Sequence, residues 1–236
     1  MRVLTIIQAR MGSTRLPGKV ARRVGGRTVL AWVVYRTRLA RLAGEIVVAT
    51  SELPRDDAVE AMCSEIGVPC FRGSELDVLD RFYQAARSRD ADTVVRVTAD
   101  CPLLDPALLD TIVETHVRER ADYVSVEGAP LGVAQESLSA TALEQSWRQA
   151  KLPDEREHVI LYVTERPDEF KVLLLPAPPP LNLPSWRFTI DTERDVELLD
   201  GLFETTKGRL FDLAEAEIVD AVARSPRLLA LATREP

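Results

Sequence analysis

VLTIIQARMGSTRLPGK, residues 3–19, joins a short apolar run rich in β-branched residues to a loop rich in Gly, Ser, Thr, Arg and Lys. The run at 3–7 predicts a buried strand, and the loop follows it directly. In open parallel sheets, ligands bind beyond the carboxyl ends of the strands, so this loop stands where a nucleotide would bind. The opening stretch therefore indicates an α/β fold with a polar site at the end of its first strand.

The same alternation of short apolar runs and helix-length amphipathic stretches continues over the first half of the chain. It is typical of β-α-β units and predicts a mostly parallel, doubly wound, Rossmann-like sheet. We expect a single domain over 1–236, in which the less regular section 127–183 is a small inserted subdomain for acceptor binding or dimerisation. The predicted strands are 3–7, 46–50, 68–71, 94–98, 123–126, 136–138, 170–175 and 187–190. The predicted helices are 29–40, 57–66, 78–89, 106–118, 140–150, 155–165, 193–204 and 212–223.

Composition limits the classes of function. The 236 residues are 46% hydrophobic and carry a net charge of -7, which argues against broad nucleic-acid binding because phosphate backbones attract an excess of Lys and Arg. The longest apolar runs are far shorter than the roughly 20 residues of a membrane span, and no secretory signal pattern opens the chain. We expect a cytoplasmic protein. The stretch 10–41 nevertheless contains Lys and Arg but no Asp or Glu, and such a basic region suits a polyphosphate.

The first loop has the residue types of a phosphate site. Gly12 permits close backbone approach, Ser13 offers a hydroxyl and an amide donor, and Arg10, Arg15 and Lys19 supply positive charge. The glycine spacing is not that of a Walker A motif, and there is no GxGxxG. A solvated basic loop that only connects two elements remains the alternative interpretation.

Two aspartates each end a predicted strand. Asp100 lies in RVTADCPLLDP, residues 96–106, and Asp191 lies in RFTIDTERDVELL, residues 187–199. Carboxylates at this edge of a sheet suit magnesium, which takes one or two protein carboxylates and completes its shell with water and phosphate oxygens. The structural alternative is helix capping, which we prefer for Asp105 ahead of Pro106 and which also remains open for Asp191.

These three segments, in this order and at comparable spacing, resemble the cytidylyltransferase family. That family includes the CMP-3-deoxy-manno-octulosonate and CMP-sialic acid synthetases and the group of spore coat polysaccharide biosynthesis protein F. The last group is the most similar, because it also has counterparts of FRGSELDVLDRF at 71–82 and EREHV at 155–159. The resemblance extends from Val3 to about Leu202. It implies a nucleotidyltransferase fold, CTP and Mg²⁺ as ligands, a sugar-like acceptor and a homodimer.

The resemblance also implies roles for particular residues. The implied catalytic residues are Arg15, Lys19, Asp100 and Asp191, of which Asp100 and Asp191 would bind the metal. The implied nucleotide-binding residues are Ala9, Arg10, Gly12, Ser13, Arg15, Lys19, Arg72, Ser74 and Arg81. The implied acceptor-binding residues are Gln135, Glu136, Arg156 and His158, although His158 is equally well interpreted as a core or subunit-contact residue. Ala134 stands where relatives usually have Asp, which points to an unusual acceptor.

The sequence thus predicts transfer of CMP from CTP to a sugar-like acceptor in polysaccharide or glycoconjugate precursor synthesis. Two alternatives stay open. A metal-dependent glycosyltransferase can share the fold and a carboxylate pair, although the chain has no DxD triplet. A non-catalytic nucleotide-binding protein would bind CTP without consuming it.

Overall fold

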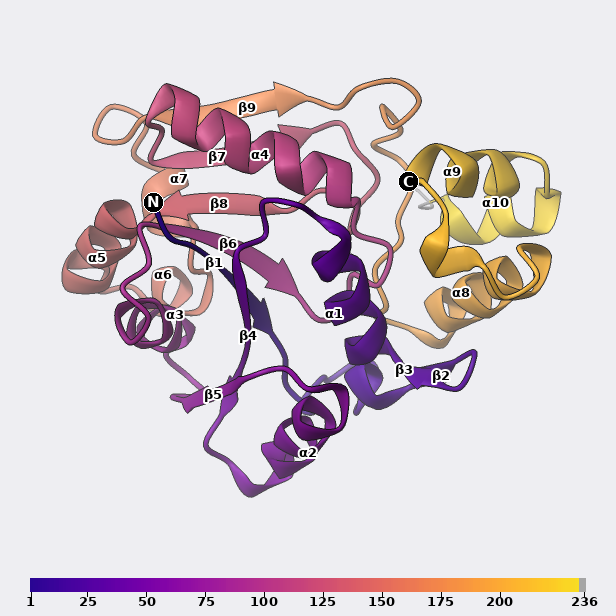
Figure 1. Cartoon of the computed structure of the whole chain (residues 1–236), viewed down its shortest axis with the longest axis horizontal. Helices are drawn as coiled ribbons and strands as arrows, with labels where there is room; N and C mark the ends of the chain where they lie inside the picture. Colours follow the sequence, from indigo (N-terminus) through magenta and orange to yellow (C-terminus); the bar gives the residue numbers. More distant parts are fainter. Residues whose placement is uncertain (234–236) are drawn as a thin grey trace.

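The apolar runs of the sequence form a seven-stranded sheet in the computed structural model, which describes residues 1–233 (Figure 1). Within this sheet β8 is antiparallel to both of its neighbours, β6 and β7, and the remaining pairs are parallel. In spatial order the strands are β5 (Cys70–Gly73), β4 (Glu45–Ser51), β1 (Val3–Gln8), β6 (Thr93–Thr98), β8 (Glu136–Ser139), β7 (Tyr123–Glu127) and β9 (Val172–Pro176).

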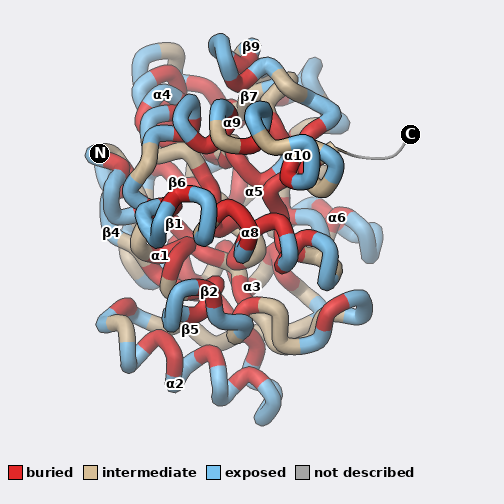
Figure 2. Tube along the Cα trace, turned by 90° about the vertical axis from the view of Figure 1, so that its right-hand side faces the viewer, coloured by how far each residue is buried: buried red, intermediate tan, exposed pale blue. Residues whose placement is uncertain are grey.

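Helices cover both faces of the sheet, because the central strands are apolar on both sides. One face packs on α1 (Val29–Leu39), α2 (Asp57–Ile66) and α4 (Pro106–Glu119). The other packs on α3 (Val78–Arg87), α5 (Ala140–Gln149) and α7 (Leu161–Thr164), with the short α6 (Pro153–Glu157) beside α3. Figure 2 shows buried residues concentrated in the middle of the molecule and exposed ones on the outer helices. The predicted doubly wound, mostly parallel α/β fold is confirmed.

Three further helices gather at one side of the sheet: α8 (Glu193–Thr205), α9 (Glu215–Ala223) and α10 (Pro226–Ala232) (Figure 1). They form an apolar cluster with α1, in which the rings of Trp32 and Phe211 stack with centroids 3.8 Å apart. The sequence predicted α8 and most of α9. It did not predict α10, nor the small hairpin of β2 (Arg23–Val24) and β3 (Arg27–Thr28) that precedes α1.

Three predicted elements differ from the structure. The expected strand at 187–190 is an extended segment outside the sheet, because its backbone pairs with the loop at Leu131 and with Asp100 instead of a strand. The expected helix at 155–165 breaks at His158, whose backbone is not helical (φ -98°, ψ 87°). The expected helix at 212–223 begins at Glu215, after a 3-10 turn (Leu210–Asp212).

The section 127–183 contributes β8 and β9 to the main sheet. Its interpretation as an acceptor or dimerisation subdomain stays a prediction. Across residues 1–233, the helices are too short or too polar to cross a membrane.

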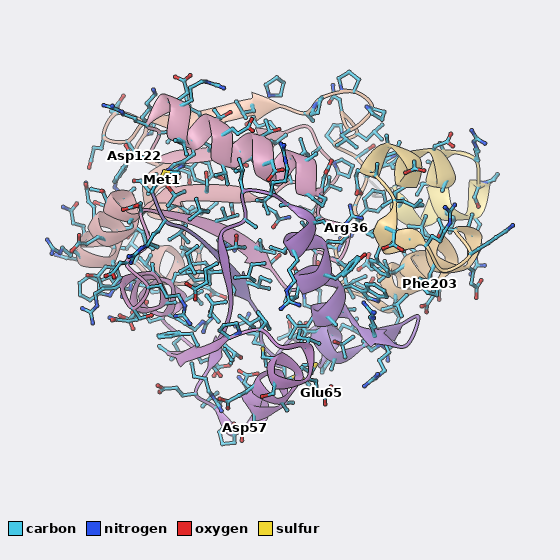
Figure 3. The ribbon with its side chains drawn as sticks, in the orientation of Figure 1. Met1, Arg36, Asp57, Glu65, Asp122 and Phe203 are labelled. Atoms are coloured by element: carbon cyan, nitrogen blue, oxygen red, sulfur yellow. The ribbon has the colours of Figure 1, made fainter. Side chains whose placement is uncertain are left out.

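A buried ion pair fastens the C-terminal helices to α1. Arg36, labelled in Figure 3 on the side of α1 that faces those helices, is 1% exposed and pairs with the equally buried Glu215 at 2.9 Å. Its guanidinium also donates hydrogen bonds to the carbonyl oxygens of Leu104, Phe211 and Leu213. One side chain therefore joins α1, the loop before α4 and the start of α9.

The variant Arg36→Met tests this connection. We expect the free energy of unfolding to fall by about 3–5 kcal/mol at pH 8, because Glu215 would lose its buried cation and folding would then require the carboxyl either to bind a proton or to stay charged and unpaired. Burial already raises the pKa of Glu215 to about 8 against the pull of Arg36, and the variant should raise it further. A carboxyl with a raised pKa favours the folded state below its ordinary value, and this contribution is lost as the pH rises through the folded value.

The deficit of Arg36→Met should therefore be smaller at pH 5 than at pH 8. Urea unfolding at both pH values measures it. The double variant Arg36→Met with Glu215→Leu is the control and should recover most of the loss. Equal losses of unfolding free energy at the two pH values would contradict the assignment of the pH-dependent part to the Glu215 carboxyl.

Candidate active site

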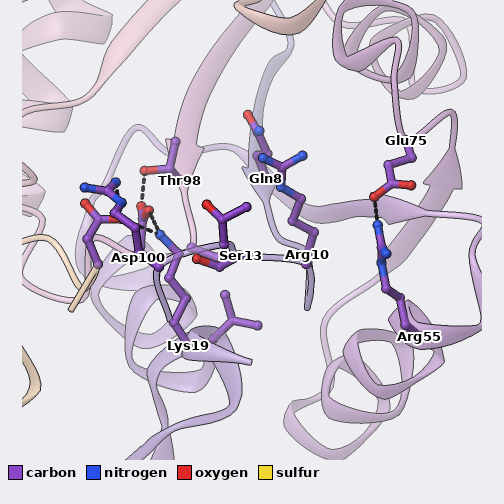
Figure 4. Close-up of a pocket in the computed structure, with 14 residues that line it drawn as sticks. Gln8, Arg10, Ser13, Lys19, Arg55, Glu75, Thr98 and Asp100 are labelled. Atoms are coloured by element: carbon purple, nitrogen blue, oxygen red, sulfur yellow. Dashed lines mark hydrogen bonds and ion pairs between the residues drawn. The ribbon is translucent and has the colours of Figure 1, made fainter. Parts of the chain in front are cut away.

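A cleft of about 690 Å³ opens at the carboxyl ends of β1 and β6 (Figure 4). Gln8 and Thr98 are register partners at the ends of these two parallel strands, so the loops that follow them leave the sheet side by side. The segment that leads to Asp191 reaches the same place, because the amide of Ile190 donates a 2.8 Å hydrogen bond to the carbonyl oxygen of Asp100. The cleft is lined by Gln8, Arg10, Gly12, Ser13, Thr14, Arg15, Lys19, Val20, Arg55, Glu75, Thr98, Ala99, Asp100 and Asp191.

The centre of this cleft is the ammonium group of Lys19. It lies 2.5 Å from Asp100 Oδ2 and 2.9 Å from Asp191 Oδ1. Burial acts to lower the pKa of Lys19, but the two carboxylates outweigh it and hold that pKa above its ordinary value. Lys19 is therefore a positive charge shared by the two predicted metal ligands.

Each aspartate is oriented by further contacts. The hydroxyl of Thr98 donates to Asp100 Oδ1 at 2.6 Å. Asp191 receives Arg15 at 3.0 Å and Arg187 at 2.9 Å. Burial acts to raise the pKa of Asp191, but Lys19, Arg15 and Arg187 together lower it, so this carboxylate stays ionised. It does not cap α8; there the side chain of Asp195 accepts the amide of Thr192 at 2.7 Å.

A buried aspartate anchors the backbone of the first loop, residues 8–19. The amide of Met11 donates to Asp56 Oδ1 at 2.7 Å, and Asp56 is fully buried. The loop closes through a 3.0 Å bond from the amide of Gly18 to the carbonyl oxygen of Met11, with Gly18 in a left-handed conformation (φ 70°). The backbone of the loop is thus fixed at Met11 and Gly18, while the side chains of Arg10 and Arg15 are 42% and 62% exposed.

A second cavity of about 380 Å³ adjoins the first. The two cavities share Thr98 and Asp100 in their linings, so they meet at the predicted metal ligand. Gln135 and Glu136, two of the predicted acceptor-binding residues, line the second cavity together with Arg96, Cys101, Ser125, Val126, Ala129, Pro130, Leu131, Gly132, Ala134 and Thr189.

Several predicted site residues lie outside these two cavities. Arg72, Ser74 and Arg81 line a third cavity beside β5, where burial lowers the pKa of Arg81 to about 10. Ala9 is buried, and its amide donates to the carbonyl oxygen of Ala49. Their roles in nucleotide binding stay predictions.

The two remaining acceptor candidates are Arg156, on the short helix α6, and His158, directly after it. Arg156 donates to Asp77 Oδ2 through Nε at 3.0 Å, and also through Nη2, and to the carbonyl oxygen of Trp147 at 2.7 Å. His158 is exposed at the end of α6. Neither residue lines the first or second cavity, and their roles stay predictions.

Sequence reasoning missed several residues of the cleft, among them Gln8, Thr98, Arg55 and Glu75. Gln8 and Thr98 end the two central strands, and that position was a usable signal. Arg55 and Glu75 form an ion pair across the cleft from Lys19 (Figure 4). Arg55 follows β4 and Glu75 follows β5, and no sequence pattern in either stretch predicts that these two side chains pair. Arg187 was also missed, although it lies four residues before Asp191 in the quoted segment.

Known proteins resemble this chain over nearly its whole length. The profile of the cytidylyltransferase family matches residues 4–220. The spore coat polysaccharide biosynthesis protein SpsF of Bacillus subtilis (strain 168) is 38% identical over 229 residues, 95% of this chain and 95% of that protein.

Two solved structures have the same fold. A cytidylyltransferase from Leptospira borgpetersenii serovar Hardjo-bovis (strain JB197) is 31% identical, with a TM-score of 0.91 over 100% of this chain and 98% of that one. A CMP-2-keto-3-deoxy-manno-octonic acid synthetase complexed with CTP is 15% identical, with a TM-score of 0.65 over 87% of this chain and 100% of that one.

The variant Gly132→Ala tests whether the close approach of Gly132 to Thr189, in the wall of the second cavity, requires glycine. Gly132 has φ 95°, and an added Cβ would stand 2.8 Å from Thr189 Cγ2 and 3.1 Å from the Thr189 backbone nitrogen. We expect a loss of about 1–3 kcal/mol in the free energy of unfolding from backbone strain, plus a further loss from the collision. Gly26→Ala is the matched control, because Gly26 has φ 83° but an added Cβ would meet nothing within 4 Å. Equal losses in urea unfolding of the two variants would show that the collision is absent.

Proposed function

The chain belongs to the cytidylyltransferase family, and we propose that it transfers CMP from CTP to a sugar-like acceptor with release of pyrophosphate. The observation that carries this proposal is the meeting of two cavities at Asp100, one rich in cations and the other not. A transferase needs a place for each reactant and a shared wall where they react. We further propose a role in polysaccharide precursor synthesis, on the similarity to SpsF.

The cleft at Lys19 suits the triphosphate. Its lining holds the cations Arg10, Arg15, Lys19 and Arg55, against the acids Glu75, Asp100 and Asp191. Arg10 and Arg15 have side chains 42% and 62% exposed, so both are accessible to a ligand. Guanidinium groups grip phosphate oxygens in pairs, and the ammonium of Lys19 acts as a point charge.

The residues present fit a divalent cation. Carboxylate oxygens of Asp100 and Asp191 converge on one point, where they now share the Lys19 ammonium. In residues 1–233 no three of the His, Cys, Asp and Glu side chains converge as a metal site, so the protein would offer these two carboxylates. Two carboxylates completed by phosphate oxygens are what Mg²⁺ prefers. We propose that Asp100 and Asp191 hold Mg²⁺, which supplies positive charge beside the phosphates when bound.

The proposed reaction is an in-line displacement at the α-phosphorus. An acceptor oxygen forms the new bond to that phosphorus, the bond to the β-phosphate oxygen breaks, and the acceptor proton is released. Arg15 and Lys19 stabilise the charge that develops on pyrophosphate. Thr98 and Arg187 hold the two aspartates in position, so that orientation and electrostatics supply most of the acceleration.

The direct test is pyrophosphate release from each of the four nucleoside triphosphates, with Mg²⁺ and a panel of sugars. We expect acceptor-dependent release from CTP, abolished by Asp100→Ala and by Asp191→Ala. Lys19→Met should lower kcat/KM by about 100-fold to 1000-fold, comparable with the loss of one electrostatic stabiliser.

Asp105→Asn is the matched control. Asp105 lies on the same loop as Asp100, but its carboxylate caps α4 by accepting the amide of Ala107 at 2.8 Å. This variant should keep turnover and lose at most about 1 kcal/mol of stability. CTP binding without turnover on any acceptor would favour the non-catalytic alternative, and cleavage of a nucleotide-sugar would favour the glycosyltransferase. An absence of nucleotide binding would contradict the proposal.

A further inference from the structure

One cation of the first cleft comes from outside the basic loop. Arg55 belongs to the 3-10 turn Pro54–Asp56 after β4, lines the cleft, and has a side chain that is 51% exposed. Neither the basic loop at 8–19 nor the family motifs at 71–82 and 96–106 contain this residue. The proposed mechanism gives Arg55 no step, so its place in the cleft calls for an explanation.

The turn that carries Arg55 contacts the basic loop at two adjacent residues. Asp56 accepts the amide of Met11 at 2.7 Å. Beside this bond, the Arg55 guanidinium lies against Gly12, where an added Cβ would stand 3.2 Å from Arg55 Cζ and Nη2. Asp56 is fully buried, so moving the turn away from the loop would break a buried hydrogen bond. The backbone at Arg55 is therefore fixed beside the basic loop, while its guanidinium stays at the surface of the cleft.

A carboxylate of the protein now holds this guanidinium. Glu75, which follows β5, pairs with Arg55 inside the cleft (Figure 4). An ion pair with a half-exposed arginine is weak, because water screens the two charges, so an anion of higher charge can displace the carboxylate. A guanidinium binds phosphate oxygens with the same fork of N–H groups that it presents to a carboxylate. Glu75 therefore occupies the position that a phosphate would take at Arg55.

The place of Arg55 suits the terminal phosphates of the nucleotide. In the proposed reaction the α-phosphorus reacts near Asp100, where the two cavities meet. In an in-line displacement the leaving oxygen lies opposite the attacking one, so pyrophosphate extends away from the second cavity and into the first cleft. Arg55 lines the first cleft and not the second. In Figure 4 it lies across the cleft from Lys19 and Asp100, with Arg10 and Ser13 between them.

We propose that Arg55 is a further phosphate-binding residue, which exchanges Glu75 for the β- and γ-phosphates of CTP. This inference rests on the proposed CMP transfer. The exchange involves no covalent change: the guanidinium leaves one anion and binds another, and the Glu75 carboxylate passes to water. Because Asp56 keeps the turn on the basic loop, only side chains need to move. A nucleoside monophosphate has no β- or γ-phosphate and would not engage Arg55.

Calorimetric titration of the wild type and Arg55→Met with CTP and with CMP, both with Mg²⁺ and without an acceptor, tests the proposal. The variant should raise the Kd of CTP by about tenfold or more, as expected for the loss of charge-assisted hydrogen bonds. The Kd of CMP should change by less than about threefold. Arg41→Met is the matched control, because Arg41 is also exposed and paired with an acid, Asp110, but precedes β4 at the other end of the sheet. An unchanged Kd of CTP in Arg55→Met, or an equal rise for CMP, would overturn the proposal.

The variant Glu75→Gln tests the exchange of anions. It should lower the Kd of CTP by about threefold or more, because the phosphates no longer compete with a carboxylate for Arg55. In the Arg55→Met background the same substitution should have a smaller effect, since no ion pair remains to be broken. Weaker CTP binding in Glu75→Gln, or equal effects in the two backgrounds, would overturn the exchange. Failure of the wild type to bind CTP would defeat the proposed function as well, whereas normal CTP binding by Arg55→Met would defeat only this inference.

Discussion

The ammonium of Lys19 is the contact on which the arrangement of the site depends. It joins the first loop to carboxylates more than eighty and more than one hundred and seventy residues further along the chain. Three separate features bring these groups together: the parallel register of β1 and β6, the turn of the basic loop fixed on Asp56, and the bond from Ile190 to Asp100. Without the cation, two carboxylates would be forced together in a partly buried place, which costs free energy. A lysine here therefore stabilises a cluster of charges that the proposed chemistry requires.

Much of this site was predictable, because it follows from one rule of parallel sheets. Asp100 follows a buried strand, and the basic loop follows another, so both had to lie at the same edge. Asp191 was also located correctly, but for an incomplete reason. Its segment was predicted as a sheet strand at 187–190, whereas it reaches the edge by pairing with the loop at Leu131 and with Asp100. The apolar pattern indicates that a segment is buried and extended; it does not indicate which backbone it pairs with.

Contacts between side chains that are distant in the sequence could not be predicted from the sequence. The pair of Arg55 and Glu75 spans the cleft from two loops, and no periodicity relates them. The same holds for Arg96 and Glu136, which face each other only because β8 runs antiparallel to β6 in a register that pairs these two residues. That register depends on where the chain re-enters the sheet after an irregular section, which local propensity does not determine. The resemblance to a family named Glu136 as a site residue, but it gave no indication that a cation would already neutralise it.

The two cavities differ in how their charged side chains are paired, and this difference bears on where each proposed reactant would bind. In the first cleft, exposed arginines remain accessible, and Lys19 is shared between two acids, so a polyanion meets positive charge that it can engage. In the second cavity, the guanidinium is committed to a carboxylate on the neighbouring strand. Because both cavities include Asp100, the two reactants of the proposed transfer would meet at that carboxylate, with the triphosphate on the side where Arg10 and Arg15 are accessible. The accessible cations of the first cleft therefore favour that cavity for the proposed triphosphate, which leaves the second cavity for the proposed acceptor.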